Sequence, residues 1–90
     1  MQQLRFLVKG RVQGVGFRYF ACTTAESIGI RGYAKNLVDG SVEVVAEGNE
    51  GQLAMMEQAL REGPSFGRVD EVLKSVSEVS ADRFTGFTIR

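Results

Sequence analysis

The chain has 90 residues, a formal net charge of zero and a hydrophobic fraction of 43%, which is ordinary for a globular protein and too apolar for a disordered one. It contains no histidine and a single cysteine, Cys22. This composition excludes Ser-His and Cys-His catalytic systems, imidazole metal sites, internal disulfides and zinc–cysteine clusters. A chain of this length predicts a single domain over residues 1–90.

Nothing in the sequence indicates a membrane span or a secretory leader. The longest apolar runs, 19–22 and 53–56, have four residues each, whereas about 20 are needed to cross a bilayer. The first residues lack the charged-then-apolar pattern and the cleavage site of a leader. We therefore expect a cytoplasmic protein.

The charges are balanced in sum but divided along the chain. Residues 1–35 carry a net charge of +5 and residues 36–90 a net charge of −5. Two explanations are open: the fold interleaves the two parts, or the basic segment marks an anion site.

The first third of the chain predicts a strand followed by a helix. Leu4, Phe6 and Val8 alternate with polar residues, as in a strand with one apolar face. From Phe17 the apolar period changes to three and four residues, which is typical of a helix, and Gly29 suits the position that closes it.

The middle of the chain predicts a hairpin and a second helix. Residues 31–38 and 42–47 flank Asp39-Gly40, a dipeptide strongly preferred in two-residue turns. Asn49 and Gln52 have the spacing of a capping box, and Gly63-Pro64 ends the helical pattern. The apolar stripe of this helix is expected to comprise Leu53, Met55, Met56, Ala59 and Leu60.

The last part of the chain predicts two further strands. Residues 69–79 have a valine spacing that also fits a helix, but they are rich in valine and serine and lack alanine, which favours a strand. Residues 84–90 form a last short strand. The order βαββαβ with a short C-terminal strand predicts an α+β, ferredoxin-like (split βαβ) sandwich, in which two helices cover one face of an antiparallel sheet.

The connector at residues 10–18 (GRVQGVGFR) has the features of an anion site. Glycines allow successive N–H groups to converge, the following helix contributes its positive N-terminal dipole, and Arg18 offers a planar fork of donors. The dinucleotide pattern fails at Tyr19, and no Gly-Lys-Ser/Thr of a P-loop is present. A catalytic thiolate is an alternative, but Cys22 lies within an apolar helical pattern, which favours core packing.

A second segment makes the connector specific. Residues 32–42 (GYAKNLVDGSV), with Gly48, form a second long motif, and the two motifs together closely resemble the acylphosphatase family over essentially the whole chain. The resemblance implies a ferredoxin-like fold and hydrolysis of the carboxyl–phosphate bond of acyl phosphates, without a metal or other cofactor. It assigns phosphate binding to Arg18 and water positioning to Asn36. The phosphate cradle it implies comprises Gln13, Gly14, Val15, Gly16 and Phe17, together with Arg18.

The chemistry agrees with those roles. A carboxylate leaving group has a conjugate acid with a pKa of about 4, so it needs little general-acid assistance. Phosphoryl transfer depends mainly on positioning and charge stabilisation, which backbone amides and Arg18 supply. The carboxamide of Asn36 can orient a water molecule but is too weakly basic to take its proton, so we infer that the substrate phosphate receives it.

Two alternatives belong to other classes. An RNA-recognition motif shares this element order and the start of its signature at 31–34, but Lys35, Asn36 and Val38 replace the apolar and aromatic residues it needs. Zero net charge and 9% aromatic residues leave little for base stacking or phosphate neutralisation. The second alternative keeps the fold but makes the protein a regulatory sensor that binds small anions without hydrolysing them. We expect a monomer whose partner is a small-molecule acyl phosphate, and neither a nucleic acid nor a membrane.

Overall fold

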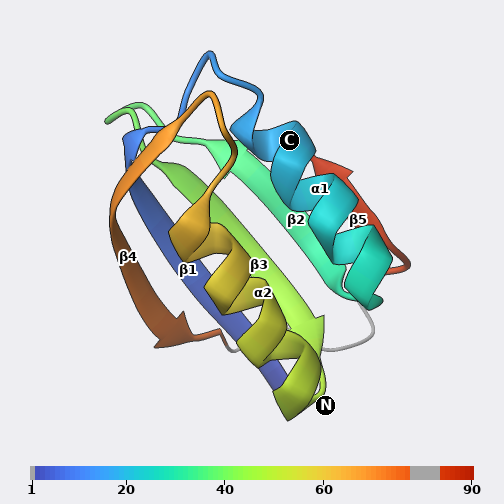
Figure 1. Ribbon diagram of the computed structural model, residues 1–90. Coiled ribbons are helices and arrows are strands. Elements are labelled where there is room, and N and C mark those ends of the chain that lie inside the picture. The colour runs from blue at the N-terminus through green and yellow to red at the C-terminus, as the bar shows by residue number, and fades with distance from the viewer. Residues whose placement is uncertain (1, 78–83) are drawn as a thin grey trace.

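The computed structural model describes residues 2–77 and 84–90, which form five strands and two helices (Figure 1). In chain order, the elements are β1 (Gln2–Arg11), α1 (Phe17–Ile28), β2 (Arg31–Asn36), β3 (Val42–Gly48), α2 (Glu50–Glu62), β4 (Arg68–Val76) and β5 (Phe87–Ile89). This order confirms the expected succession of elements, including the choice of a strand for β4.

The strands form one sheet in the order β4-β1-β3-β2-β5. Strands β4, β1, β3 and β2 are antiparallel to their neighbours, in the arrangement of a ferredoxin-like fold. The expectation of a wholly antiparallel sheet is wrong at β5, which pairs in parallel with β2. Since β4 ends at the end of the sheet where β2 begins, a strand that returns from there has to run in the direction of β2.

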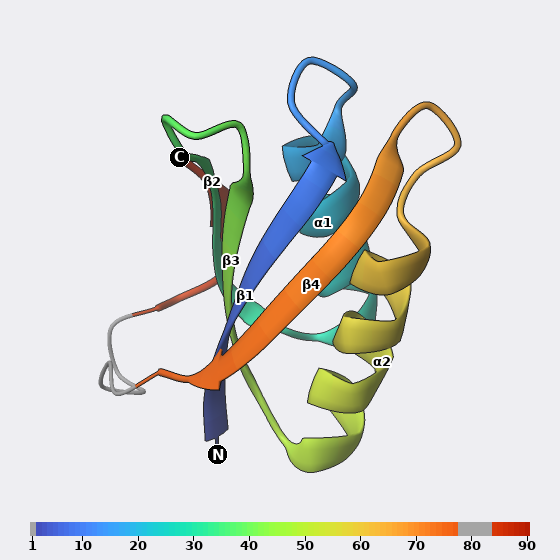
Figure 2. The same cartoon turned by 90° about the vertical axis from the view of Figure 1, so that its left-hand side faces the viewer.

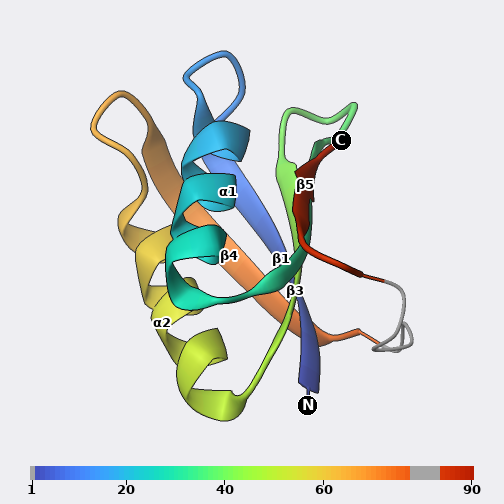
Figure 3. The same ribbon diagram turned by 90° about the vertical axis from the view of Figure 1, so that its right-hand side faces the viewer.

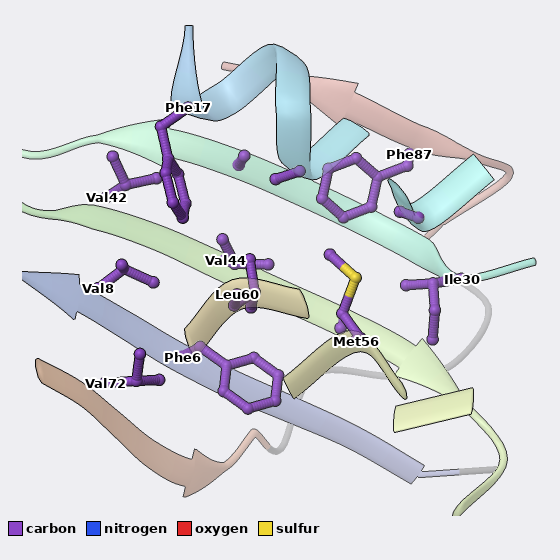
Figure 4. Packing of buried hydrophobic residues seen from close by; sticks show 14 of the residues in the cluster. Phe6, Val8, Phe17, Ile30, Val42, Val44, Met56, Leu60, Val72 and Phe87 are labelled. Atoms are coloured by element: carbon purple, nitrogen blue, oxygen red, sulfur yellow. The ribbon is translucent and has the colours of Figure 1, made fainter. Parts of the chain in front are cut away.

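Both helices cover the same face of the sheet, as predicted (Figure 3). The core lies between the helices and this face, where β1 contributes Phe6 and Val8, and α2 contributes Met56 and Leu60 (Figure 4). These side chains are essentially inaccessible to solvent, so their burial stabilises the contact of the two layers. The expected strand and helix periods are therefore confirmed at these positions.

The hairpin between β2 and β3 has a different turn from the one predicted. Leu37 N–H donates to the Ser41 oxygen at 2.9 Å, and Gly40 N–H donates to the Leu37 oxygen at 3.2 Å. Gly40 has a φ of +95°, whereas no non-glycine residue in the described ranges has a positive φ. A two-residue type I′ turn needs positive φ at both central residues, and Asp39 does not have it. Residues 38–40 therefore form a three-residue loop between Leu37 and Ser41.

The details of the other elements differ in small ways from expectation. Helix α2 begins with the predicted capping box of Asn49 and Gln52. Met55 does not belong to its buried stripe, because 58% of its surface is exposed. The last strand is shorter than expected, since Phe84 precedes β5 without pairing as a strand. In the strand predicted over residues 69–79, Val79 lies outside the described residues.

Cross-strand ion pairs interleave the basic and acidic parts of the chain. Three bases of the first 35 residues pair with acids of the second part: Arg5 with Glu43, Lys9 with Asp39 and Arg31 with Glu47. Glu43 is therefore not a freely solvated acid, and only 14% of its side chain is exposed. The other three bases of this part, Arg11, Arg18 and Lys35, pair with no Asp or Glu side chain within residues 2–77 and 84–90.

One end of the sheet gathers three connections: the β1–α1 loop, the β2–β3 hairpin loop and the α2–β4 loop (Figure 2). The start of α1 and the end of β2 therefore meet at this end of the molecule. Neither helix in the part of the chain that the structure describes has the length and apolar character needed to cross a membrane.

Candidate active site

A cavity of about 180 Å³ opens at this end of the molecule. Its lining comes from the β1–α1 loop, α1, β2 and β5: Val12, Gly14, Gly16, Phe17, Arg18, Tyr19, Asn36 and Ile89. The fold thus brings Arg18 and Asn36 to one cavity. The volume is below the range of about 300–1,000 Å³ typical of drug-sized ligands, so the cavity suits a small molecule.

The loop that enters the cavity has the backbone geometry of an anion nest. Gly14 and Gly16 have φ values of +76° and +78°, and Val15 between them has a negative φ. This alternation turns successive N–H groups toward a common point, where they attract an anion. A Cβ atom at Gly14 or Gly16 would meet nothing within 4 Å, so the backbone conformation alone, not a lack of space, calls for glycine here.

The start of helix α1 leaves its N–H groups available. Gly16 is the N-cap, no side chain caps the helix, and the first turn contains no acidic residue. Helix α2, in contrast, is closed by the capping box of Asn49. Because the first N–H groups of a helix have no internal partner and carry the positive end of its dipole, the start of α1 favours an anion in the cavity.

Arg18 projects from the first turn of α1, which adds a guanidinium to these backbone donors. Its Nη1 donates a hydrogen bond of 2.9 Å to the backbone oxygen of Arg90, next to β5. That contact uses a single N–H, and the Arg18 guanidinium forms no other hydrogen bond within residues 2–77 and 84–90. The remaining donors of the fork are therefore available to a phosphate.

Asn36 is the last residue of β2, where it pairs in register with Val42 of β3. The Oδ1 atom of its side chain is buried and finds no hydrogen-bond partner in the described part of the chain. An orphaned buried acceptor costs about 1–3 kcal/mol, and such a group calls for an explanation such as a ligand or a water molecule. Asn36 thus brings to the cavity lining a carboxamide whose buried Oδ1 has no partner in the described residues.

Two residues of the expected phosphate cradle do not line the cavity. The side chain of Gln13 donates two hydrogen bonds to the β2–β3 hairpin loop. Val15 packs against the hydrophobic core. Of Gln13 and Val15, only the main chain is therefore left for the expected cradle, whereas Gly14, Gly16 and Phe17 lie in the lining itself.

Three lining residues were not anticipated. Tyr19 and Ile89 are apolar lining residues that remain exposed, at 71% and 44% of their surface, and Val12 is buried. Tyr19 directly follows Arg18 in the first turn of α1, and this adjacency could have indicated that Tyr19 lines the same cavity. Ile89 carries no comparable signal, because its position depends on the pairing of β5 with β2.

The remaining candidate, Cys22, lies outside the cavity lining. It packs against the core, and its thiol lies 3.7 Å from the backbone oxygen of Phe87. Burial raises the pKa of the Cys22 thiol, and the carboxylate of Glu26 raises it further. A nucleophilic cysteine needs a lowered pKa, so this environment favours a packing role.

No group of three or more metal-binding side chains occurs within residues 2–77 and 84–90. The donors in the lining are backbone N–H groups, the guanidinium of Arg18 and the carboxamide of Asn36. This fold and this cavity define the class as a small ferredoxin-like protein with a cavity at one end of the sheet, whose donors suit an anion.

Comparisons with known proteins agree with that class. The family model described as acylphosphatase matches residues 4–89. The chain is 47% identical to an acylphosphatase of Pasteurella multocida, over 100% of this chain and 99% of the relative. It is 53% identical to an acylphosphatase of Thermus thermophilus, over 80% of this chain and 82% of the relative.

The structural comparison gives the same result. The crystal structure of the acylphosphatase from Bacillus subtilis superposes with a TM-score of 0.93 at 40% identity, and the match covers 100% of this chain and 99% of that one. The chain belongs to the acylphosphatase family.

Proposed function

We propose that the protein hydrolyses the carboxyl–phosphate bond of small acyl phosphates, giving a carboxylate and inorganic phosphate. Membership of the acylphosphatase family supports this reaction, since the relatives carry that name. It also favours hydrolysis over the RNA-binding alternative. The residue roles and the independence from metal ions that follow are part of the same proposal.

The phosphate of the substrate occupies the anion nest. The N–H groups of the loop from Gln13 to Phe17 surround its oxygens, and the guanidinium of Arg18 binds two of them in a bidentate manner. These donors are fixed before the substrate binds. They stabilise the charge that redistributes over the phosphoryl oxygens in the transition state, which is the main requirement of phosphoryl transfer.

Asn36 orients the attacking water molecule. Its carboxamide forms a hydrogen bond with the water, which places the water oxygen in line with the bond between phosphorus and the acyl oxygen. As the new P–O bond forms, the bond to the acyl oxygen breaks and the carboxylate leaves with the electron pair. The proton of the water passes to a phosphate oxygen, since a carboxamide is too weak a base to accept it.

This chemistry needs neither a histidine nor a metal ion in our proposal. The leaving carboxylate is a weak base, with a conjugate acid of pKa about 4, so it departs without prior protonation. The charge stabilisation that a metal would supply comes from the backbone N–H groups and Arg18.

The observation that carries the proposal is the convergence on one cavity of two glycines with left-handed φ, an arginine with unused donors and a buried, unpartnered carboxamide oxygen. An anion-binding site alone explains the first two features. A reaction that uses an oriented water also accounts for the third.

The decisive experiment is hydrolysis of acetyl phosphate in excess chelator, with an alkyl phosphate ester as the matched control. We expect turnover of acetyl phosphate alone, because an alkoxide is a much poorer leaving group than a carboxylate. Binding of phosphate without turnover would identify an anion sensor instead. Loss of activity in chelator would show that a metal ion takes part.

A further inference from the structure

Gln13 connects the two halves of the candidate active site. Its Nε2 atom donates hydrogen bonds of 2.7 Å to the Leu37 oxygen and 2.9 Å to the Ser41 oxygen. Leu37 and Ser41 are the two ends of the hairpin loop, since Leu37 N–H also donates to the Ser41 oxygen. Both hydrogens of the carboxamide are thus used on one turn that lies 24 and 28 positions further along the chain.

The residues joined by this contact are the chain neighbours of the anion nest and of Asn36. Gln13 directly precedes Gly14 of the anion nest, and Leu37 directly follows Asn36 at the end of β2. The hydrogen bond between Gln13 and Leu37 therefore bridges the loop that would hold the phosphate and the residue that would aim the water. The side chain of Asn36 has no such support of its own, because its Oδ1 lacks a partner in the described ranges.

The hairpin itself does not need Gln13. The Leu37 oxygen also accepts from Gly40 N–H, and the Ser41 oxygen also accepts from Leu37 N–H. Removal of the Gln13 carboxamide thus leaves neither carbonyl without a donor, so the loop keeps its internal hydrogen bonds. What is lost is the connection between the hairpin and the nest.

We propose that Gln13 is a positioning residue, which sets the place of the Asn36 carboxamide relative to the bound phosphate. The inference rests on the proposed function. Glutamine suits this role because one uncharged Nε2 group provides two donors, whereas a glutamate carboxylate provides none. A shift of about 1 Å between reacting groups can cost about 100-fold in rate, so a tether of this kind acts on turnover without touching the substrate.

The test uses Gln13→Met, which keeps the length of the side chain and removes both N–H donors of the carboxamide. Gln58→Met is its control. Gln58 is exposed on α2, far along the chain from the cavity lining. For Gln13→Met we expect kcat for acetyl phosphate to fall by about 10- to 100-fold, with inhibition by inorganic phosphate changed by less than about threefold. Gln58→Met should match the parent protein in both measurements.

A double-mutant cycle with Asn36→Ala decides whether Gln13 acts through Asn36. If it does, Gln13→Met changes kcat by less than about twofold once Asn36 is absent. Equal losses in both backgrounds, or phosphate inhibition that weakens as much as kcat falls, would overturn the positioning role. An Asn36→Ala protein with full turnover would instead remove the role of Asn36 in the proposed function, and the positioning role with it.

A measurement that does not depend on hydrolysis tests the tether itself. Backbone ¹⁵N relaxation should report increased motion from Leu37 to Ser41 in Gln13→Met and not in Gln58→Met. An unchanged loop in Gln13→Met would show that the two hydrogen bonds do not hold the hairpin, and would overturn the proposal even if turnover falls.

Discussion

Arg18 Nη1 and the backbone oxygen of Arg90 form a hydrogen bond of 2.9 Å between the first turn of α1 and the chain beyond β5. Arg90 is itself held in place, because its N–H donates to the Ala34 oxygen at 2.8 Å and its guanidinium lies 4.0 Å from the ring centroid of Tyr33. One N–H of Arg18 is thus anchored to a fixed point, which orients the rest of its planar head group toward the cavity.

The Arg18→Lys substitution should abolish most of the activity although it preserves the charge. A lysine ammonium lacks the planar fork that binds two phosphate oxygens, and loss of one transition-state donor typically costs about 100- to 1,000-fold in kcat. Steady-state kinetics with acetyl phosphate measures this effect. Arg61→Lys, at the last turn of α2, is the control, and its kinetics should be unchanged. Near-normal turnover of Arg18→Lys would refute the proposed bidentate contact between Arg18 and the phosphate.

The Asn36→Ala substitution should separate activity from stability. We expect the barrier to rise by about 2.7–4 kcal/mol, as for loss of a transition-state donor, while inorganic phosphate still inhibits. Because Oδ1 has no partner in the described part of the chain, its removal should leave the free energy of unfolding unchanged or slightly higher. Urea denaturation checks the second effect. Loss of phosphate inhibition would show that Asn36 binds the phosphate.

The Cys22→Ser substitution should leave turnover unchanged. Burial, with the carboxylate of Glu26, raises the pKa of the thiol, so little thiolate is present near neutral pH. Measurement of kcat and KM for acetyl phosphate tests this expectation. A folded but inactive Cys22→Ser protein would restore the thiolate hypothesis.

Between acid conditions and about pH 8, the stability of the fold should change with pH only at the acid end. Burial alone would raise the pKa of Glu43, but hydrogen bonds from Arg5 and Tyr33 outweigh it and hold this pKa below its ordinary value. A hydrogen bond from Lys74 lowers the pKa of Glu57 in the same way. A carboxyl whose pKa is lower in the folded state stabilises the fold above its unfolded pKa of about 4.3, and this contribution is lost as the pH falls through the folded value.

We therefore expect a constant urea midpoint between about pH 6 and pH 8, where a chain without histidine has few groups to titrate, and a steady decrease below about pH 4. Glu43→Gln should reduce the loss in acid. A midpoint that already falls between pH 7 and pH 6 would contradict this assignment of the titrating groups.

Much of the fold could be predicted because local patterns agreed with tertiary packing. The alternation at Phe6 and Val8 and the capping box of Asn49 are each set by a few neighbouring residues. The hairpin turn and β5 were less accessible. Asp39-Gly40 is compatible with two loop lengths, and the parallel pairing of β5 depends on which edge of the sheet is free, which no local pattern specifies.

The candidate site was predictable in its types of residue more than in its geometry. Long motifs identified Arg18 and Asn36, and the glycines at 14 and 16 indicated a nest. Sequence alone did not reveal that the carboxamide of Gln13 faces the hairpin, since its partners are backbone oxygens with no side-chain signature. Nor did it place Ile89 in the lining, because that position follows from the pairing of distant strands.

The central place of β1 in the sheet has a consequence for biosynthesis. This strand lies between β3 and β4 in the sheet, and residues 68–76 of β4 are synthesised well after it. Its second edge stays unpaired until residues 68–76 have been translated, so the native sheet is not complete before then. Non-local pairing of this kind slows folding and exposes unpaired strand edges, so β1 keeps one open edge while the segment between it and β4 is being made.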